Sequence, residues 1–241
     1  MTDPTHSTTR VALLAGATGL VGRALLHTLL DSPRYALVHA LLRRAAPSLA
    51  TSEKLTLHSV DFNALPPVMP AVDDVYIALG TTIKAAGSEA AFRHVDFDAV
   101  VNTARAAREA GATNLATARA AREAGATNLA VVSGLGANAK SRVFYNRVKG
   151  EMQDAVSRLG YTSVVIAQPS LLVGDRAALG QPPRAGEEWT MRMLRPVMPV
   201  LPSGVRPIDA AVVARALVQA TLAARPGVHI LSSAAMQSMR S

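Results

Sequence analysis

Residues 11–22 read VALLAGATGLVG, an apolar run that leads directly into a turn punctuated by three glycines. The run from Val11 to Ala15 predicts a buried strand, and the spacing of apolar residues from Leu20 to Leu30 predicts a helix. The order of strand, glycine-rich turn and helix is typical of a phosphate-binding loop.

The three glycines have separate roles in such a loop. Gly16 allows the tight turn, Gly19 lets the backbone approach a pyrophosphate, and Gly22 lets the helix pack closely on the strand. The helix that follows supplies unpaired N–H donors and the positive end of its dipole. We therefore predict a dinucleotide site here rather than a purely structural turn, formed by Gly16, Thr18, Gly19, Leu20, Val21 and Gly22.

The rest of the chain alternates predicted strands with predicted helices. Further strands are predicted over residues 36–42, 55–60, 75–79, 129–132, 162–167 and 228–231. Helices are predicted from near Ser88 or Asp96, over 143–159, and over 210–224 with Asp209 as the N-cap residue. This alternation predicts the α/β class, a doubly wound Rossmann fold with a parallel sheet of about seven strands. We expect residues 1–241 to form a single NAD(P)-binding domain, with ligands beyond the carboxyl ends of the strands.

Residues 176–207 interrupt this alternation, and we expect them to form a small C-terminal segment that covers the substrate. The segment is rich in proline and glycine and contains the only tryptophan. Residues 187–195 could form a short amphipathic helix with Trp189, Met193 and Leu194 on its apolar side. These side chains would suit an apolar or aromatic ligand. The alternative is that they pack onto the sheet.

Residues 103–116 and 117–130 carry the identical sequence TARAAREAGATNLA. Two identical copies indicate a recent tandem duplication rather than a repeat architecture, which needs several similar units. If it is helical, one copy spans about 3.9 turns and returns nearly to its original face. Because the second copy runs into Val131, we expect it to supply the fifth strand through Asn128 and Leu129. The first copy should lengthen the preceding helix or bulge into solvent, with a break at Gly111.

Composition and charge narrow the class of protein. The absence of cysteine excludes disulfides, thiolate metal sites and a cysteine nucleophile. The formal charge of +8 comes from scattered basic residues, without the stripe or motif that nucleic-acid binding needs. No apolar run reaches the roughly 18 residues of a membrane helix, and the polar N-terminus does not resemble a secretory signal. We therefore expect a cytoplasmic protein with a small-molecule substrate, without nucleic-acid or membrane partners, and either monomeric or homodimeric.

The end of the second predicted strand favours NADP(H) over NAD(H). An NAD-preferring site has an acidic residue about 20 residues after the glycines, where it binds the ribose 2′-hydroxyl. Here that strand ends in Arg43 and Arg44, and no acidic residue lies at that end. Guanidinium groups pair well with a phosphate. The alternative is that both are ordinary solvated arginines.

The candidate reactive residues are Tyr145 and Lys149, which lie four residues apart and share one face of a predicted helix. A nearby ammonium favours the phenolate and lowers the tyrosine pKa, so the pair can move a proton to or from a carbonyl or alcohol oxygen. Ser133 ends the fifth predicted strand and could hydrogen-bond the substrate oxygen or simply cap the strand. Asn102 could support a water relay, although we favour a solvent-facing position, and Asp96 on the same helix is undecided.

These residues carry a family resemblance that runs from Val11 to about residue 231. The chain resembles the atypical short-chain dehydrogenase/reductase superfamily. The motifs that carry the resemblance are the glycine turn, Gly80-Thr81-Thr82, the helix from Phe92, Ser133, residues 145–151 (YNRVKGE) and residues 168–170 (QPS). The most similar branch is the Tat-interacting-protein-like oxidoreductases, also labelled nucleoside-diphosphate-sugar epimerase-like. The resemblance implies NADPH binding, with Arg43 and Arg44 at the 2′-phosphate. It also implies further contacts from Asp61 and Phe62 at the adenine, from Leu79, Gly80 and Thr81 on the ribose side, and from Pro169, Ser170 and Leu171 at the nicotinamide.

The chain departs from the family pattern at three places. Gly134 stands where the family usually has a second serine, which puts the role of Ser133 in doubt. Gln168 stands where arginine is common. The duplication lies in a helix that often forms the dimer interface, which puts the oligomeric state in doubt.

These features leave three functional hypotheses. The first is an NADPH-dependent oxidoreductase that acts on a small carbonyl or alcohol substrate, with Tyr145, Lys149 and Ser133 as catalytic residues. The second is an NADPH-binding regulatory protein or sensor without significant turnover, since one fold hosts many functions. The third is epimerisation of a sugar nucleotide, for which the chain is short.

Overall fold

A single seven-stranded sheet lies at the centre of the computed structural model, which describes residues 9–46, 49, 51–110, 126–174 and 204–239. The strand order is β3-β2-β1-β4-β5-β6-β9, and every neighbouring pair is parallel. The strands are β1 (Arg10–Ala15), β2 (Tyr35–Leu42), β3 (Leu55–Ser59), β4 (Asp74–Ile77), β5 (Asn128–Val132), β6 (Ser163–Gln168) and β9 (Gly227–Ser232). The predicted doubly wound α/β fold is confirmed.

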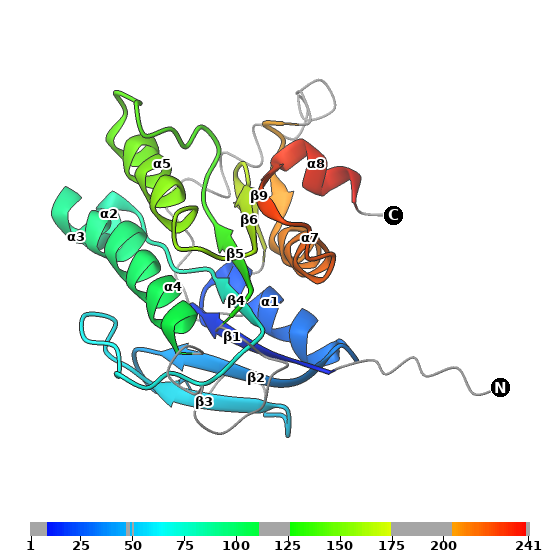
Figure 1. The fold of residues 1–241 in the computed structure, drawn as a ribbon. Coiled ribbons are helices and arrows are strands. Elements are labelled where there is room, and N and C mark those ends of the chain that lie inside the picture. The colour runs from blue at the N-terminus through cyan, green and yellow to red at the C-terminus, as the bar shows by residue number, and fades with distance from the viewer. Residues whose placement is uncertain (1–8, 47–48, 50, 111–125, 175–203, 240–241) are drawn as a thin grey trace.

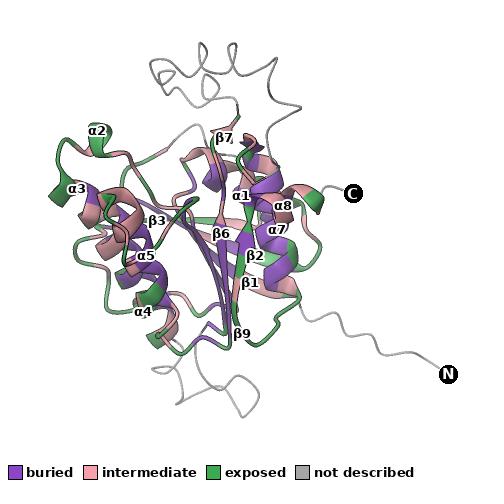
Figure 2. Ribbon diagram, turned by 90° about the horizontal axis from the view of Figure 1, so that it is seen from above, coloured by how far each residue is buried: buried purple, intermediate pink, exposed green. Residues whose placement is uncertain are grey.

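Helices cover both faces of this sheet (Figure 1). They are α1 (Leu20–Asp31), α2 (Ile83–Ala86), α3 (Glu89–Arg93), the π-helical turn η1 (His94–Asp98), α4 (Ala99–Glu109), α5 (Phe144–Val156), α7 (Ala210–Leu222) and α8 (Ser233–Ser238). The core on one face forms between the sheet, α1 and α7, and the core on the other face forms between the sheet, α4 and α5. Figure 2 shows the buried central strands between these two helical layers.

The central strands are apolar at nearly every position because both of their faces are buried. All residues of β4 and β5 are buried, and so are the last four of β1. Strands covered by helices on both sides therefore have continuous apolar runs instead of an alternating pattern. The edge strands β3 and β9 are largely exposed and carry more polar residues.

The strand order reverses between β1 and β4, which places the carboxyl ends of these two strands side by side. From β1 the chain proceeds outward through β2 to β3, and it then returns to β4 on the other side of β1. In open α/β sheets, ligands bind at this point, beyond the carboxyl ends of the strands. The glycine turn follows β1, so it opens onto that edge.

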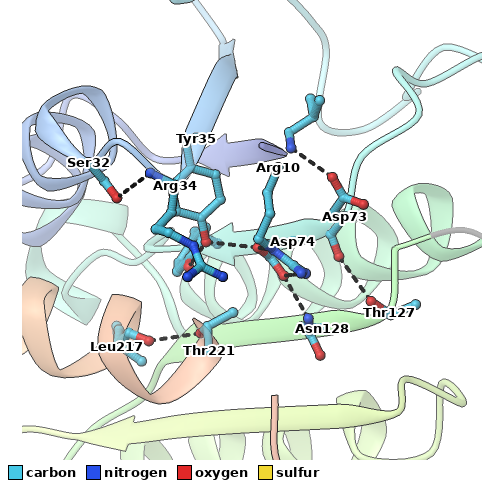
Figure 3. Close-up of polar contacts among 12 residues, drawn as sticks. Arg10, Ser32, Arg34, Tyr35, Asp73, Asp74, Thr127, Asn128, Leu217 and Thr221 are labelled. Carbon is cyan, nitrogen blue, oxygen red and sulfur yellow. Dashed lines mark hydrogen bonds and ion pairs between the residues drawn. The ribbon is translucent and has the colours of Figure 1, made fainter. Parts of the chain in front are cut away.

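A buried polar network joins four strands at the opposite, amino-terminal edge of the sheet (Figure 3). The first residues of four adjacent strands are Arg10, Tyr35, Asp74 and Asn128. The fully buried Asp74 carboxylate accepts two hydrogen bonds from Arg10 at 2.6 Å, one from Tyr35 Oη at 2.8 Å and one from Asn128 Nδ2 at 2.7 Å. The hydrogen bond to Asp74 raises the pKa of Arg10. This single carboxylate therefore joins β1, β2, β4 and β5.

The second copy of the duplicated sequence supplies β5, as predicted. This strand starts at Asn128 and continues into Val131 and Val132, which pair with β6. The first copy begins inside α4, which ends at Glu109. Residues 111–125, which contain the predicted break at Gly111, lie outside the described residues, and so does most of the predicted covering segment 176–207.

Four short elements among the described residues were not predicted from the sequence. These are the helix α2, the turn η1, the helix α8 and a two-stranded sheet of β7 (Leu172–Val173) and β8 (Ile208–Asp209). The predicted N-cap role of Asp209 is confirmed, because its carboxylate accepts from the Ala211 N–H at 2.7 Å.

Candidate active site

Two of the three glycines in the turn after β1 leave no room for a β-carbon. Gly16 has φ +93°, and a β-carbon there would lie 2.6 Å from the carbonyl oxygen of Ala78. A β-carbon on Gly22 would lie 1.9 Å from the carbonyl oxygen of Gly16. Gly16 therefore permits the turn, and Gly22 permits the close packing of α1 against it.

Among the described residues, no side chain caps the N-terminus of α1 at Gly19. A β-carbon on Gly19 would approach no protein atom closer than 3.4 Å, so packing within the protein does not require a glycine there. Gly19 is also the N-cap residue, with no side chain to accept from the first-turn N–H groups, and that turn contains no acidic residue. An anion such as a pyrophosphate fits this open, positively polarised end. Thr18 is exposed beside it, and Leu20 and Val21 begin the helix.

Arg43 and Arg44 directly follow β2, and both side chains are exposed. Asp61 and Phe62 follow β3, the next strand outward in the sheet. The exposed Asp61 side chain accepts from the Asn63 N–H at 2.9 Å. All four residues therefore lie at the same edge of the sheet as the glycine turn.

Tyr145 projects from the start of α5 towards the loop that follows β5. A β-carbon on Gly134 would lie only 2.8 Å from the Tyr145 phenol oxygen. The Tyr145 ring also packs against the buried Phe92 ring of α3, with centroids 5.4 Å apart. The phenol thus lies beside the residue that follows Ser133, and the space it occupies exists because residue 134 is glycine.

Lys149 lies one turn further along α5 and is buried in an ion pair. Its side chain is 4% exposed, and its ammonium is 2.7 Å from Oδ1 of Asp96, which is 1% exposed. Asp96 Oδ2 accepts from the Thr81 N–H at 2.8 Å. A β-carbon on Gly80 would lie 3.3 Å from Asp96 Oδ1 and 3.7 Å from Lys149 Nζ. The predicted residue Gly80 therefore lies beside this ion pair, and Thr81 hydrogen-bonds its carboxylate.

Ser133 is buried and takes part in a short chain of hydrogen bonds. Its hydroxyl accepts from Gln153 Nε2 at 2.6 Å, and Gln153 Oε1 accepts from Gln168 Nε2 at 3.1 Å. A hydroxyl that accepts one bond can still donate its own proton. The hydrogen bond from Gln153 therefore orients the hydroxyl of Ser133, the residue that precedes Gly134.

The remaining predicted residues also follow strands. Leu79 comes after β4, and residues 169–171 come after β6. The Pro169 carbonyl accepts from the Leu135 N–H at 2.9 Å, which ties this segment to the loop after β5. Ser170 hydrogen-bonds Ser233 Oγ at 3.0 Å and the Arg206 carbonyl, while Leu171 is exposed.

A sequence model described as NAD(P)H-binding matches residues 16–170, from the glycine turn to the segment after β6. The chain belongs to this NAD(P)H-binding family. This match confirms the expected nicotinamide cofactor as either NAD or NADP.

Curated relatives of this NAD(P)H-binding chain include fungal proteins. The protein named "Protein fmp52, mitochondrial" of Aspergillus clavatus is 34% identical over 221 residues, covering 89% of this chain and 88% of the relative. The protein of the same name in Candida albicans is 33% identical over 168 residues, covering 68% and 67%. Because these relatives are named mitochondrial, the cytoplasmic location predicted from composition is wrong. No helix among the described residues has the length and apolar character needed to cross a bilayer.

Solved structures confirm the resemblance to the short-chain dehydrogenase/reductase and epimerase-like superfamily at the level of the fold. MoeE5 in complex with UDP-glucose and NAD aligns with a TM-score of 0.64 at 18% identity, covering 92% of this chain and 74% of MoeE5. Vestitone reductase from alfalfa aligns with a TM-score of 0.63 at 16% identity, covering 93% and 77%.

Sequence reasoning missed the roles of two residues in this NAD(P)H-binding protein. It left Asp96 undecided, although Asp96 is the partner of Lys149, and it did not consider Gln153. Gln153 lies four residues after Lys149, so the helical spacing could have placed it on the same face of α5. Nothing in the sequence around Asp96 indicates burial. The preference for a solvent-facing Asn102 is confirmed, since this residue is exposed.

Proposed function

We propose that this chain is an NADPH-dependent oxidoreductase of the short-chain dehydrogenase/reductase type that acts on a small carbonyl or alcohol substrate. The observation that carries the proposal is the position of the Tyr145 phenol beside Gly134, at the end of β5, with the buried Lys149 one helical turn away. This end of the sheet also carries the glycine turn of an NAD(P)H-binding family.

Each catalytic residue has a distinct role in this proposal. A bound nicotinamide supplies or accepts the hydride. Tyr145 Oη donates a proton to the carbonyl oxygen during reduction and takes it back during oxidation. Ser133 donates a hydrogen bond to the same oxygen, and the Gln153 amide fixes the orientation of the serine. Lys149 modulates the acidity of Tyr145 and binds the ribose.

The proposal is tested by measuring NADPH oxidation with a broad panel of aldehydes and ketones, together with NADPH affinity. Turnover of at least one class of carbonyl compound is expected. Tight NADPH binding with no turnover across the panel would instead favour a regulatory or sensor function.

We predict that Arg43→Glu weakens NADPH binding by about 10- to 100-fold, because a charge-assisted pair with the 2′-phosphate is lost and replaced by repulsion. The affinity for NADH, which lacks that phosphate, should change by less than about threefold. Isothermal titration calorimetry with both cofactors measures the two effects. Arg34→Glu is the matched control, because this exposed arginine precedes β2 at the opposite edge of the sheet. Equal losses for NADPH and NADH would contradict the assignment.

We also predict that Gly134→Ser lowers turnover by about 100-fold, the scale expected when a reacting group is displaced by about 1 Å. The serine β-carbon would need the space now occupied by the Tyr145 phenol, at 2.8 Å. NADPH affinity should stay within about threefold of the parent value. The control is Ala223→Ser, since this exposed residue caps the carboxyl end of α7, away from the candidate site. Full activity in Gly134→Ser would refute this explanation of the departure from the family pattern.

A further inference from the structure

Two glutamine side chains connect the last residue of β6 to the serine hydroxyl that follows β5. Gln168 Nε2 donates to Gln153 Oε1 at 3.1 Å, and Gln153 Nε2 donates to Ser133 Oγ at 2.6 Å. Ser133 and Gln153 are buried, and Gln168 is half-buried at the outer end of the series. We call these three side chains the amide relay.

The amide relay has a direction, because each amide presents an acceptor oxygen on one side and donor N–H groups on the other. In the observed direction Ser133 accepts from Gln153, and among the described residues its hydroxyl makes no hydrogen bond as a donor. If both amides turned over, the same two contacts would form in reverse, and Ser133 would donate its proton to Gln153. The direction of the relay therefore decides whether the Ser133 proton is available to a substrate.

Residue 168 is the end of the amide relay that can impose this direction. The Ser133 hydroxyl can either donate or accept, so the inner end permits both directions. Gln168 presents its amide nitrogen to Gln153, and this donor holds the Gln153 oxygen outward and the Gln153 nitrogen towards Ser133. A side chain at position 168 that only donates would keep this direction, whereas one that only accepts would reverse it.

We propose that Gln168 is a positioning residue, which acts through Gln153 to hold Ser133 as a hydrogen-bond donor to the substrate oxygen. The inference rests on the proposed function, in which Ser133 donates to a carbonyl oxygen. Gln168 touches neither the substrate nor the cofactor in this proposal, and its effect passes through the two hydrogen bonds of the amide relay.

Substitutions of opposite hydrogen-bonding character at position 168 test the inference by steady-state kinetics. Gln168→Glu provides a carboxylate that only accepts, so it should reverse the relay and lower kcat/KM for carbonyl reduction by about 100-fold, as Ser133→Ala should. Gln168→Lys provides an ammonium that only donates, and its kcat/KM should exceed that of Gln168→Glu by at least about tenfold. Gln219→Glu, at an exposed position of α7, is the control and should keep the parent activity.

A double-mutant cycle separates the relay from a direct effect of the new charge. Ser133→Ala leaves no hydroxyl to orient, so adding Gln168→Glu to it should change kcat/KM by less than about threefold. If Gln168→Glu fails to fold, as judged by circular dichroism, Gln153→Glu takes its place in the cycle, because a carboxylate there only accepts and Ser133 must donate to it. Losses that multiply in the double variant, or parent activity in the single acceptor variant, would overturn the inference.

The side-chain amide of Gln153 reports the direction of the relay without any turnover. The chain contains five glutamines, so the ¹⁵N resonance that is lost in Gln153→Met identifies this amide by NMR. Ser133→Ala should shift that resonance in the parent, because it removes the acceptor of Gln153 Nε2. In Gln168→Glu the same nitrogen donates to residue 168, so Ser133→Ala should leave the resonance nearly in place. Equal shifts in the two backgrounds would contradict the role of Gln168.

The two readouts distinguish failure of this inference from failure of the proposed function. Absence of turnover in the parent and in every variant would contradict the proposed function, and the Gln153 resonance would still decide the direction of the relay. Turnover that falls in Ser133→Ala but stays at the parent value in Gln168→Glu would contradict the role of Gln168 alone.

Discussion

Tyr145→Phe is expected to lower carbonyl reduction by about 10²- to 10⁴-fold, the range that a positioned proton donor contributes. The phenylalanine ring keeps the packing against Phe92, whose centroid is 5.4 Å away, so the fold should be unaffected. NADPH affinity should also be preserved, because the change removes one oxygen at the end of β5 and leaves the glycine turn intact. Steady-state kinetics and calorimetry on the same preparation measure both quantities.

Tyr161→Phe is the matched control for this substitution. Tyr161 is buried before β6, at the amino-terminal edge, and donates to the Ala104 carbonyl at 2.7 Å. Its replacement should lower the free energy of unfolding by about 1 kcal/mol, the usual net value of one hydrogen bond, with kcat unchanged. Unchanged turnover in Tyr145→Phe, or an equal loss in both variants, would exclude Tyr145 as the proton donor.

Asp74→Ala is expected to lower the free energy of unfolding by about 3–5 kcal/mol, the cost of removing one partner of a buried ion pair. The substitution leaves the half-buried Arg10 guanidinium, the Tyr35 hydroxyl and the Asn128 amide without their shared acceptor. It also removes a connection among four adjacent strands. Urea unfolding without cofactor measures the loss, so that ligand binding does not contribute to stability.

The control for Asp74→Ala is Asp154→Ala, an exposed position on α5. Changes at such positions usually stay within about 0.5 kcal/mol. A loss of less than about 1 kcal/mol in Asp74→Ala would mean that the network is not needed for stability. Because the network lies at the edge opposite the candidate site, folded Asp74→Ala should retain NADPH binding.

The strands of the central sheet were predictable because their physical signal is local. β1, β5 and β6 are apolar runs closed by glycine, serine or proline, and the glycine turn after β1 has a backbone that constrains the residue type. The helical region from Ser88 was predicted as helix, but the insertion that creates η1 leaves no mark on residue type. β7 and β8 have two residues each, too few for any periodicity.

The candidate site was predictable only in part. Spacing along one helix placed Tyr145 and Lys149 on a common face, and position after a strand singled out Ser133. The partners of these residues come from elsewhere in the chain: Asp96 is 53 positions before Lys149, and Gln153 is 20 after Ser133. Such pairs depend on how the elements pack, which a single sequence does not record. The catalytic and cofactor-binding roles of the individual residues stay predictions.

The duplicated sequence offers the folding chain two equivalent candidates for the start of β5, Asn114 and Asn128. Asn128 is followed, at the fourth and fifth positions of the strand, by Val131 and Val132, which are buried in the sheet. A strand that started at Asn114 would have Thr117 and Ala118 at these two positions. Deleting either copy yields the same shorter polypeptide, which still has one asparagine to meet Asp74. We therefore expect the fold to tolerate changes in the length of this connection, which lies at the edge of the sheet opposite the candidate site.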